Sequence, residues 1–243
     1  MQETSVKFLP CGDTALVVEF GDRIDRGLSD RVLGLDARIR AAGLPGVIES
    51  VPTFRSLMVH YDPVRTHAQA LMTAIRTLLS GELDAGRSRR LWRVPVCYDG
   101  DLAPDLADVA ERTGLTTDRV VALHSATRYH VYMIGFLPGF PYMGDLAPEL
   151  ELPRRSDPRT RVPPGSVSIA TTMTAVYPVE SPGGWHLVGT TPIKLFDPAL
   201  SPPALLAPGD AVEFERIDRA AFARIQADCE RGTYRVQHRD LAA

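Results

Sequence analysis

Hydrophobic residues follow two different periods along the first 80 residues of the chain. A helix is predicted by apolar side chains spaced by four, three and four residues, at Leu28, Val32, Leu35 and Ile39. Asp25 or Ser29 is expected to cap its start, and Gly43 its end. Residues 56–61 instead alternate between apolar and polar positions, which is the pattern of a half-buried strand.

The other elements of this N-terminal part complete a familiar order. Strands are predicted over Asp13–Phe20 and Gly46–Val51, and a second helix carries Leu71, Ile75, Leu78 and Leu79 on one face. The order strand, helix, strand, strand, helix, with a further strand expected after the second helix, is the split βαβ arrangement of a ferredoxin-like α+β sandwich. The polar segment Gly81–Arg90 is typical of a linker. We therefore expect an N-terminal α+β domain over residues 1–88.

The pattern changes at residue 89, where a second domain is expected over residues 89–243. A strand is predicted over Leu91–Tyr98, a short helix after Pro104 and another over Thr116–Ala126. Short apolar runs separated by proline and glycine then predict strands over Tyr129–Phe136, Ser166–Thr171, Ala175–Val179, Trp185–Thr190, Ile193–Phe196 and Ala211–Glu215. Such runs are typical of a closed or nearly closed β-barrel, and a C-terminal helix follows them.

Composition narrows the class of protein. The 243 residues are 44% hydrophobic, enough for a sizeable core, and the net charge of −3 argues against a strongly basic nucleic-acid binder. No apolar run is long enough to predict a membrane span, and no secretory signal pattern stands at the N-terminus. The three cysteines are widely spaced and form no CxxC pair. We expect no disulfide framework, no metal site and a cytoplasmic location.

Self-contained catalytic motifs do not occur in the sequence. It has no GxxxxGK[ST] loop, no GxSxG elbow and no HxxxH pair. The acidic residues Asp99, Asp101, Asp105 and Asp108 are expected to form a solvated face with charges near a helix start. Candidate chemistry therefore lies further along the chain, where 14 of the 20 prolines fall between Pro138 and Pro208.

The first cluster of unusual residues is Gly135–Gly144, GFLPGFPYMG. Its glycines and prolines predict an irregular, rigid loop rather than a helix or strand. Its aromatic side chains offer contact area. The loop is expected either to pack on its own domain or to form a pocket wall or docking surface.

The second cluster, Pro153–Gly165, carries four arginines within eight residues. Guanidinium groups bind carboxylate or phosphate in fixed bidentate geometry, which suits Arg154, Arg155, Arg159 and Arg161 to an anionic ligand. The alternative is that they pair with acidic residues nearby in the sequence, at Glu149, Glu151 and Asp157.

The third cluster, Ser181–Thr191, contains a tight Pro-Gly-Gly turn. Adjacent backbone N–H groups at Gly183 and Gly184 can hold an anion, and the turn presents Trp185. Ser181 is a poor nucleophile candidate, because the nearest base in the sequence is His186, five residues on. The histidines are expected to be packing or surface residues.

These clusters, with the segments SVSIA, YPVESPGGWHLVGTTPIKLFDP and PPALLAPGD, resemble the 5-oxoprolinase B-subunit family, also called allophanate hydrolase subunit 1 or KipI-like. The resemblance implies a cyclophilin-like β-barrel after the N-terminal α+β domain. It also implies a subunit, inactive alone, of an ATP-dependent 5-oxoprolinase that converts 5-oxo-L-proline to L-glutamate. The implied partners are an allophanate hydrolase subunit 2-like protein and a LamB/YcsF-type subunit. ATP and Mg²⁺ would be used by the complex, with no cofactor on this chain alone.

Two alternatives stay open within this resemblance. One is a subunit of a carboxyl-transfer or hydrolase system acting on allophanate or urea. The other is a KipI-like regulatory protein that inhibits a histidine kinase.

For a lactam hydrolase, roles can be assigned to the three clusters. Developing negative charge would be stabilised by the guanidinium of Arg159 and the N–H groups of Gly183 and Gly184. Substrate is expected to contact Tyr142, Arg154, Arg161 and Trp185. The partner subunit is expected to contact Phe136 and Phe140.

Two positions depart from the pattern of the family, which usually has glycine where this chain has Thr171 and Ala175. A β-branched threonine is strained at positive φ. Either the local backbone differs at Thr171, or the chain belongs to a divergent branch.

Overall fold

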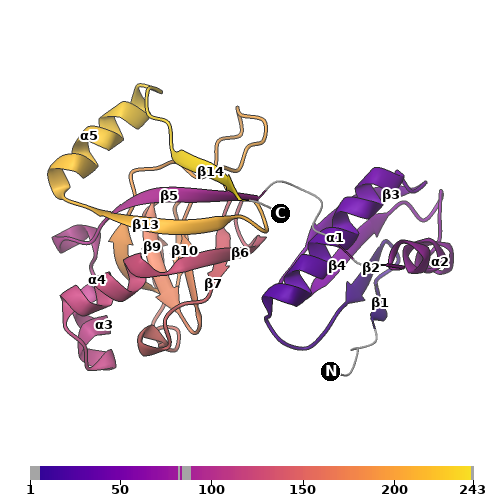
Figure 1. Ribbon diagram of the computed structural model, residues 1–243, viewed down its shortest axis with the longest axis horizontal. Helices are drawn as coiled ribbons and strands as arrows, with labels where there is room; N and C mark the ends of the chain where they lie inside the picture. Colours follow the sequence, from indigo (N-terminus) through magenta and orange to yellow (C-terminus); the bar gives the residue numbers. More distant parts are fainter. Residues whose placement is uncertain (1–5, 82, 84–88, 242–243) are drawn as a thin grey trace. The chain divides into compact units, whose positions relative to one another are not determined.

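The structure, a computed structural model, describes residues 6–81, 83 and 89–241. These residues form two compact units with the boundary between residues 88 and 89. Most of the predicted linker, residues 81–90, lies outside the described residues. Each unit has its own hydrophobic core, and each is considered by itself (Figure 1).

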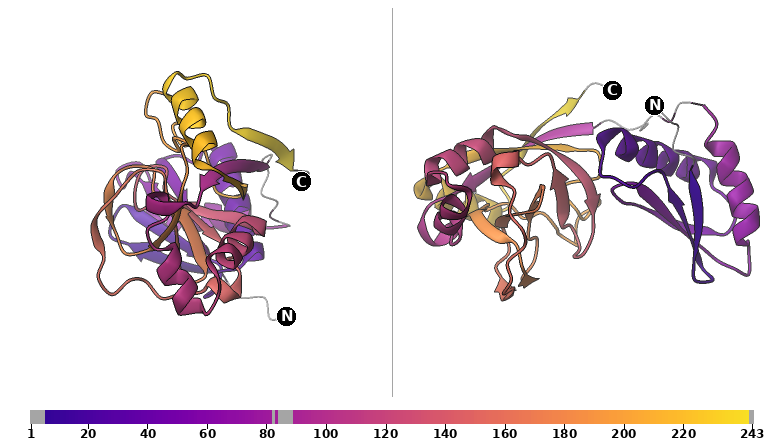
Figure 2. Two further views of the ribbon diagram at one scale, coloured as in Figure 1. Left: turned by 90° about the vertical axis from the view of Figure 1, so that its left-hand side faces the viewer. Right: turned by 90° about the horizontal axis from the view of Figure 1, so that it is seen from below.

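The first unit is a four-stranded antiparallel sheet with two helices on one face (Figure 2). In sheet order β1-β2-β4-β3, the strands are Lys7–Cys11, Ala15–Glu19, Ser56–Tyr61 and Val47–Pro52. The helices are α1 (Arg26–Ala42) and α2 (Ala68–Leu78). The predicted apolar stripe of α1 is buried between sheet and helices at Val32, Leu35 and Ile39 and partly buried at Leu28, and the apolar residues that alternate along β4 are buried there too.

The caps of α1 show how the sequence sets its length. The Leu28 N–H donates to the Asp25 carboxylate at 3.1 Å, so Asp25 is the capping residue of the two that were predicted. Gly43 ends the helix at φ 55°, a left-handed conformation that glycine adopts without strain.

The sheet has ferredoxin-like strand order, but its edge strand has an unexpected origin. The edge position beside β2 is filled by β1, which precedes β2 in the chain, and not by a strand following α2. The strand after α2, β5 (Arg89–Cys97), belongs to the second unit instead. Strand β1 was not predicted, because its residues are mostly exposed and include Pro10, a residue tolerated at sheet edges.

The second unit is a β-barrel closed by seven of its described strands, in the order β12-β9-β10-β7-β6-β13-β5 and back to β12. All neighbours are antiparallel except β5 and β13. Besides β5, the strands are β6 (Arg128–Ile134), β7 (Pro141–Gly144), β9 (Ser166–Ala170), β10 (Met173–Val176), β12 (His186–Thr190) and β13 (Ala211–Ile217). This barrel and the α+β unit confirm the predicted fold class.

Further elements surround the barrel. The strand β14 (Gln237–Leu241) pairs with the first half of β5, and β8 (Arg159–Val162) pairs with β11 (Ser181–Gly183) in a separate ribbon. The helices α3 (Leu106–Thr113) and α4 (Thr117–Ala126) pack on each other and on β12 and β13 (Figure 1). The C-terminal helix is α5 (Arg219–Glu230), and short 3₁₀ turns are η1 (Gly100–Leu102) and η2 (Pro148–Leu150). Among the described residues, no helix has both the length and the apolar character to cross a membrane.

Two predictions about the barrel are wrong. The cluster 135–144 is not wholly irregular, because Pro141 begins strand β7, a position that needs no ladder donor. Ile193–Phe196 is not a strand and contributes one isolated bridge, from Phe196 to Ala204.

Candidate functional site

The three sequence clusters meet on one side of the barrel. Strand β11 pairs with β8, which places Gly183 opposite Arg159 and joins the second and third clusters. The Arg155 N–H also donates to the Gly184 carbonyl at 2.8 Å. The first cluster joins them through Phe140, whose ring centroid lies 6.2 Å from that of Trp185.

Aromatic rings form the centre of this region. The aromatic cluster, as we call it, consists of Phe136, Phe140, Tyr142, Tyr177 and Trp185, joined by edge contacts with centroids 5.0–6.2 Å apart. Phe140, Tyr177 and Trp185 are buried, Tyr142 is half-buried, and Phe136 is 64% exposed. Of the two predicted partner contacts, the Phe136 ring is therefore exposed to solvent, and the buried Phe140 ring packs against it.

Gly183 is required by this packing. A Cβ built on Gly183 would overlap the Tyr177 hydroxyl and its ring. At Gly184 the nearest atom to such a Cβ is the Cβ of Pro158, at an ordinary 3.4 Å. The two glycines of the turn thus differ, and only the first has a close packing reason to lack a side chain.

Arg154 is the arginine of the second cluster that faces the aromatic cluster. Its guanidinium carbon lies 6.0 Å from the centroid of Trp185, and its side chain is exposed. Burial raises the pKa of Tyr142, and the Arg154 charge lowers it in part. Burial likewise raises the pKa of Tyr177, against a Trp185 backbone hydrogen bond and the Arg154 charge. Within the described residues, no carboxylate forms an ion pair with Arg154.

Arg155 and Arg159 converge on one buried carboxylate, that of Asp105. Arg159 donates from both terminal nitrogens, at 2.9 and 2.6 Å, and Arg155 donates at 3.2 Å. The Leu187 N–H donates to the same carboxylate at 2.6 Å. Asp105 is 4% exposed, so these four donors replace the water that its charge has lost.

Arg161 points elsewhere. It makes a bidentate pair with Glu180 at 3.1 and 2.8 Å, and both side chains are largely exposed. The hydrogen bond from Arg161 lowers the pKa of Glu180. The alternative of pairing with acidic residues therefore holds for Arg155, Arg159 and Arg161, but their partners are Asp105 and Glu180 and not the carboxylates at 149, 151 and 157.

His186 and Ser181 do not form a nucleophilic pair. His186 is fully buried, and its Nε2 donates to the Pro153 carbonyl at 3.0 Å. Its Nδ1 has no hydrogen-bond partner among the described residues and lies 3.6 Å from the Asp108 carboxylate. The Ser181 hydroxyl donates to the Pro182 carbonyl at 3.2 Å. Within the described part of the chain, Ser181 therefore has no base beside it, as expected of a poor nucleophile candidate.

Two contributors were missed by sequence reasoning. Asp105 was expected on a solvated face, but it lies at the base of the arginine cluster; Tyr177 was not singled out at all. Asp105 stands 50 residues or more from its arginine partners, so no local pattern joins them. The signal in the sequence was its position directly before a predicted helix; in the structure its N–H donates to the Leu187 carbonyl.

The backbone conformation of Thr171 shows whether the chain differs locally where the family usually has glycine. It adopts φ 53°, so the backbone keeps the left-handed conformation that usually carries glycine. Its hydroxyl donates to the Ala170 carbonyl at 2.6 Å, and its N–H to the Leu152 carbonyl at 2.6 Å. Ala175 lies buried inside β10 and needs no special backbone.

Metal ligands do not gather in the described part of the chain. No group of three or more His, Cys, Asp or Glu side chains there is placed to hold a metal ion.

Known proteins resemble this chain in sequence and in architecture. Residues 6–206 match the family described as carboxyltransferase domain, subdomain C and D. The 5-oxoprolinase B-subunit of Bacillus subtilis is 39% identical over 222 residues, which cover 87% of this chain and 92% of that protein. The crystal structure of TTHA0988 is 37% identical with a TM-score of 0.77, over 85% of this chain and 40% of that longer one. The Kluyveromyces lactis urea amidolyase shares the fold, with a TM-score of 0.81 at 20% identity, over 99% of this chain and 17% of that one.

Proposed function

Because the chain belongs to the 5-oxoprolinase B-subunit family, with the carboxyltransferase subdomains C and D over residues 6–206, we propose that it is a subunit of an ATP-dependent 5-oxoprolinase. The reaction consumes 5-oxo-L-proline, ATP and water and yields L-glutamate, ADP and phosphate. We propose an allophanate hydrolase subunit 2-like protein and a LamB/YcsF-type protein as its partners, in the cytoplasm. The observation that carries this proposal is the 39% identity spread over 92% of the Bacillus subtilis protein.

The site geometry supports a role in holding the substrate. A 5-oxoproline molecule has one carboxylate and one flat lactam ring. Arg154 offers a guanidinium with an exposed side chain for the carboxylate, and Tyr142 and Trp185 offer ring surface beside it. Arg161 is paired with Glu180 in this state, so its predicted contact with substrate requires that pair to open.

The catalytic assignments stay predictions. The Arg159 guanidinium is held by Asp105 through two hydrogen bonds, and the Arg159 backbone lies opposite Gly183 of β11. In that position it would orient the turn whose N–H groups, at Gly183 and Gly184, stabilise negative charge on the opening lactam. General base and nucleotide are assigned to the partner subunits, since this chain shows no self-contained catalytic motif.

The proposal is tested with the purified complex and with the isolated chain. We expect 5-oxoproline-dependent ATP hydrolysis and glutamate release from the complex and neither from the chain alone. Replacing Arg154 with Gln should raise the KM for 5-oxoproline by about 10–100-fold, the effect of one lost charge-assisted contact, with a smaller change in kcat. Arg119→Gln, which removes the same charge from the surface of α4, is the matched control and should change neither constant.

Other outcomes would contradict the proposal. Full activity of the chain alone would show an autonomous enzyme. The family match to carboxyltransferase subdomains favours a second candidate, a subunit acting in a urea or allophanate system. Turnover of urea or allophanate, with none of 5-oxoproline, would establish that alternative. High-affinity inhibition of a histidine kinase by the chain without either partner would instead favour the regulatory function.

A further inference from the structure

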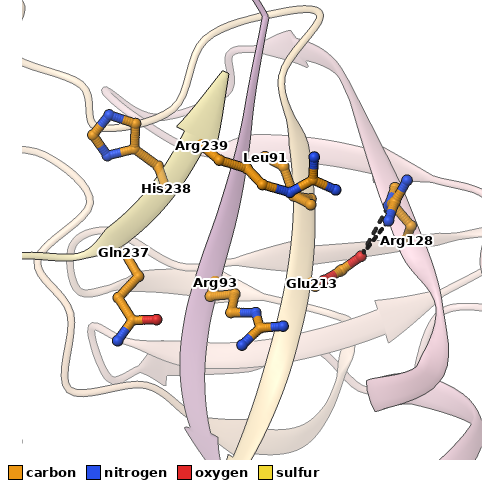
Figure 3. A pocket seen from close by; sticks show the side chains of 7 residues that line it. All are labelled: Leu91, Arg93, Arg128, Glu213, Gln237, His238 and Arg239. Carbon is orange, nitrogen blue, oxygen red and sulfur yellow. Dashed lines mark hydrogen bonds and ion pairs between the residues drawn. The ribbon is translucent and has the colours of Figure 1, made fainter. Parts of the chain in front are cut away.

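A basic hollow lies on the outer face of the barrel, and the proposed function makes no use of it. It has a volume of about 490 Å³ and is formed by side chains from β5, β6, β13 and β14 (Figure 3). We call it the β14 hollow. Apart from Leu91, its lining residues are polar or charged: Arg93, Arg128, Glu213, Gln237, His238 and Arg239.

The strand register places these side chains together. Gln237 is opposite Arg93, Arg93 is opposite Glu213, and Glu213 is opposite Arg128, so the four form one row across β14, β5, β13 and β6. Arg239 lies two residues along β14 and therefore on the same face, opposite Leu91. In Figure 3 the Arg239 side chain extends over the strands toward Arg128.

The ring of one lining residue, His238, lies on the other face of the strand. Its ring contacts that of Trp92, with centroids 4.6 Å apart, and in Figure 3 it points away from the arginines. This ring contact joins β14 to β5 on the face opposite to the hollow. β14 is the last strand of its sheet, and its pairing with β5 together with this ring contact holds the strand that carries Gln237 and Arg239.

The charges in the β14 hollow do not balance. Arg128 donates to the Glu213 carboxylate at 2.9 Å, which neutralises one guanidinium. Within the described part of the chain, neither Arg93 nor Arg239 forms an ion pair with a carboxylate. Two positive charges thus face one hollow without a counter-charge from the described residues.

We propose that the β14 hollow binds a small molecule carrying phosphate, with Arg93 and Arg239 donating to the phosphate oxygens and Gln237 adding an amide donor. A tetrahedral phosphate accepts hydrogen bonds from several directions, which matches donors that come from two different strands. A planar carboxylate accepts mainly in one plane. The volume is in the range of small-molecule pockets. The inference does not depend on the proposed function, because the hollow shares no residue with the aromatic cluster or with Arg154, Arg155, Arg159 and Arg161.

The test is a calorimetric titration of the full chain with pyrophosphate. We expect saturable binding of one pyrophosphate per chain, weakened by added salt because charges carry it. The double variant Arg93→Gln with Arg239→Gln should bind at least about tenfold more weakly, since each removed guanidinium takes away charge-assisted hydrogen bonds. Arg119→Gln on α4 removes one charge outside the hollow and should bind as the wild type does.

Three results would overturn the inference. The first is no saturable binding of pyrophosphate by the wild type. The second is equal weakening in the double variant and in Arg119→Gln, which would show attraction to net charge rather than a site. The third is tighter binding of citrate than of pyrophosphate, which would assign the hollow to carboxylates.

If the double variant unfolds, the single Arg239→Gln change still tests the site, because it alters one side chain on the outermost strand. It should then bind pyrophosphate several-fold more weakly than the wild type, and unchanged binding by a folded variant would overturn the inference. The proposed function is assayed on the complex with 5-oxoproline, so each can fail without the other.

Discussion

The arrangement around Asp105 makes a sharp prediction about stability. Replacing Asp105 with Asn keeps the shape of the side chain but removes its charge. The amide oxygen can still accept from the Leu187 N–H, but the bidentate pair with Arg159 and the bond from Arg155 are lost together. Two guanidinium groups would then be left half-buried without their counter-charge.

The size of the expected loss in the free energy of unfolding follows from how deeply Asp105 and its two arginine partners are buried. Removing one partner of a buried ion pair costs about 3–5 kcal/mol. The two arginine side chains retain 25–26% of their exposure, against 5% for Asp105, so water recovers part of that cost. We expect Asp105→Asn to lower the free energy of unfolding by about 2–4 kcal/mol, because solvent screening reduces the full buried value. For a domain of this size that lowers the midpoint by about 5–15 °C.

Tryptophan fluorescence is the suitable assay. The chain has two tryptophans, Trp92 and Trp185, and both are buried in the second unit, so their emission follows the unfolding of the barrel. Glu180→Gln, which breaks the exposed pair with Arg161, is the matched control and should leave the midpoint unchanged. A midpoint for Asp105→Asn indistinguishable from the wild type would refute the reasoning.

Three further predictions concern stability. Gly183→Ala should lower it by about 1–3 kcal/mol through overlap with Tyr177, whereas Gly184→Ala should change it little; equal melting midpoints would show that the ring moves aside. Burial lowers the pKa of His124 to about 3, against about 6.5 when unfolded, so the unfolded chain binds the extra proton between these values. The free energy of unfolding is therefore unaffected by this proton above about pH 6.5 and falls by about 2 kcal/mol by pH 5. His124→Gln should lack this pH dependence in urea titrations. Thr171→Gly should raise stability by up to about 1 kcal/mol by removing a strained φ; a loss of that size would mean that the hydroxyl bond matters more.

Local signals explain what the sequence predicted well. The helix α1 has an apolar stripe, a capping aspartate and a terminal glycine, all within 20 residues. The strand β4 alternates buried and half-buried positions along its whole length. Such features depend on neighbouring residues alone, so one sequence suffices to find them.

The site was less predictable because its contacts join distant segments. The three clusters were found from unusual composition, and the structure brings them together. Yet the carboxylate that holds two of the arginines, Asp105, comes from a segment that looked like a solvated helix start. Likewise β14 contains charged and polar residues at four of five positions, and only its pairing with β5 defines it as a strand.

The parallel pairing of β5 with β13 has a consequence for folding. Its register joins Leu91 to Ala211 and continues to Cys97 with Ile217, so every pair spans 120 residues of chain. Contacts of such sequence separation form slowly, because a long loop must close before they stabilise anything. During synthesis, the long side of β5 that faces β13 therefore stays unpaired until nearly the whole barrel has left the ribosome. A chain stopped before Ala211 would expose that edge for pairing with other chains, and we expect it to aggregate rather than to fold partially.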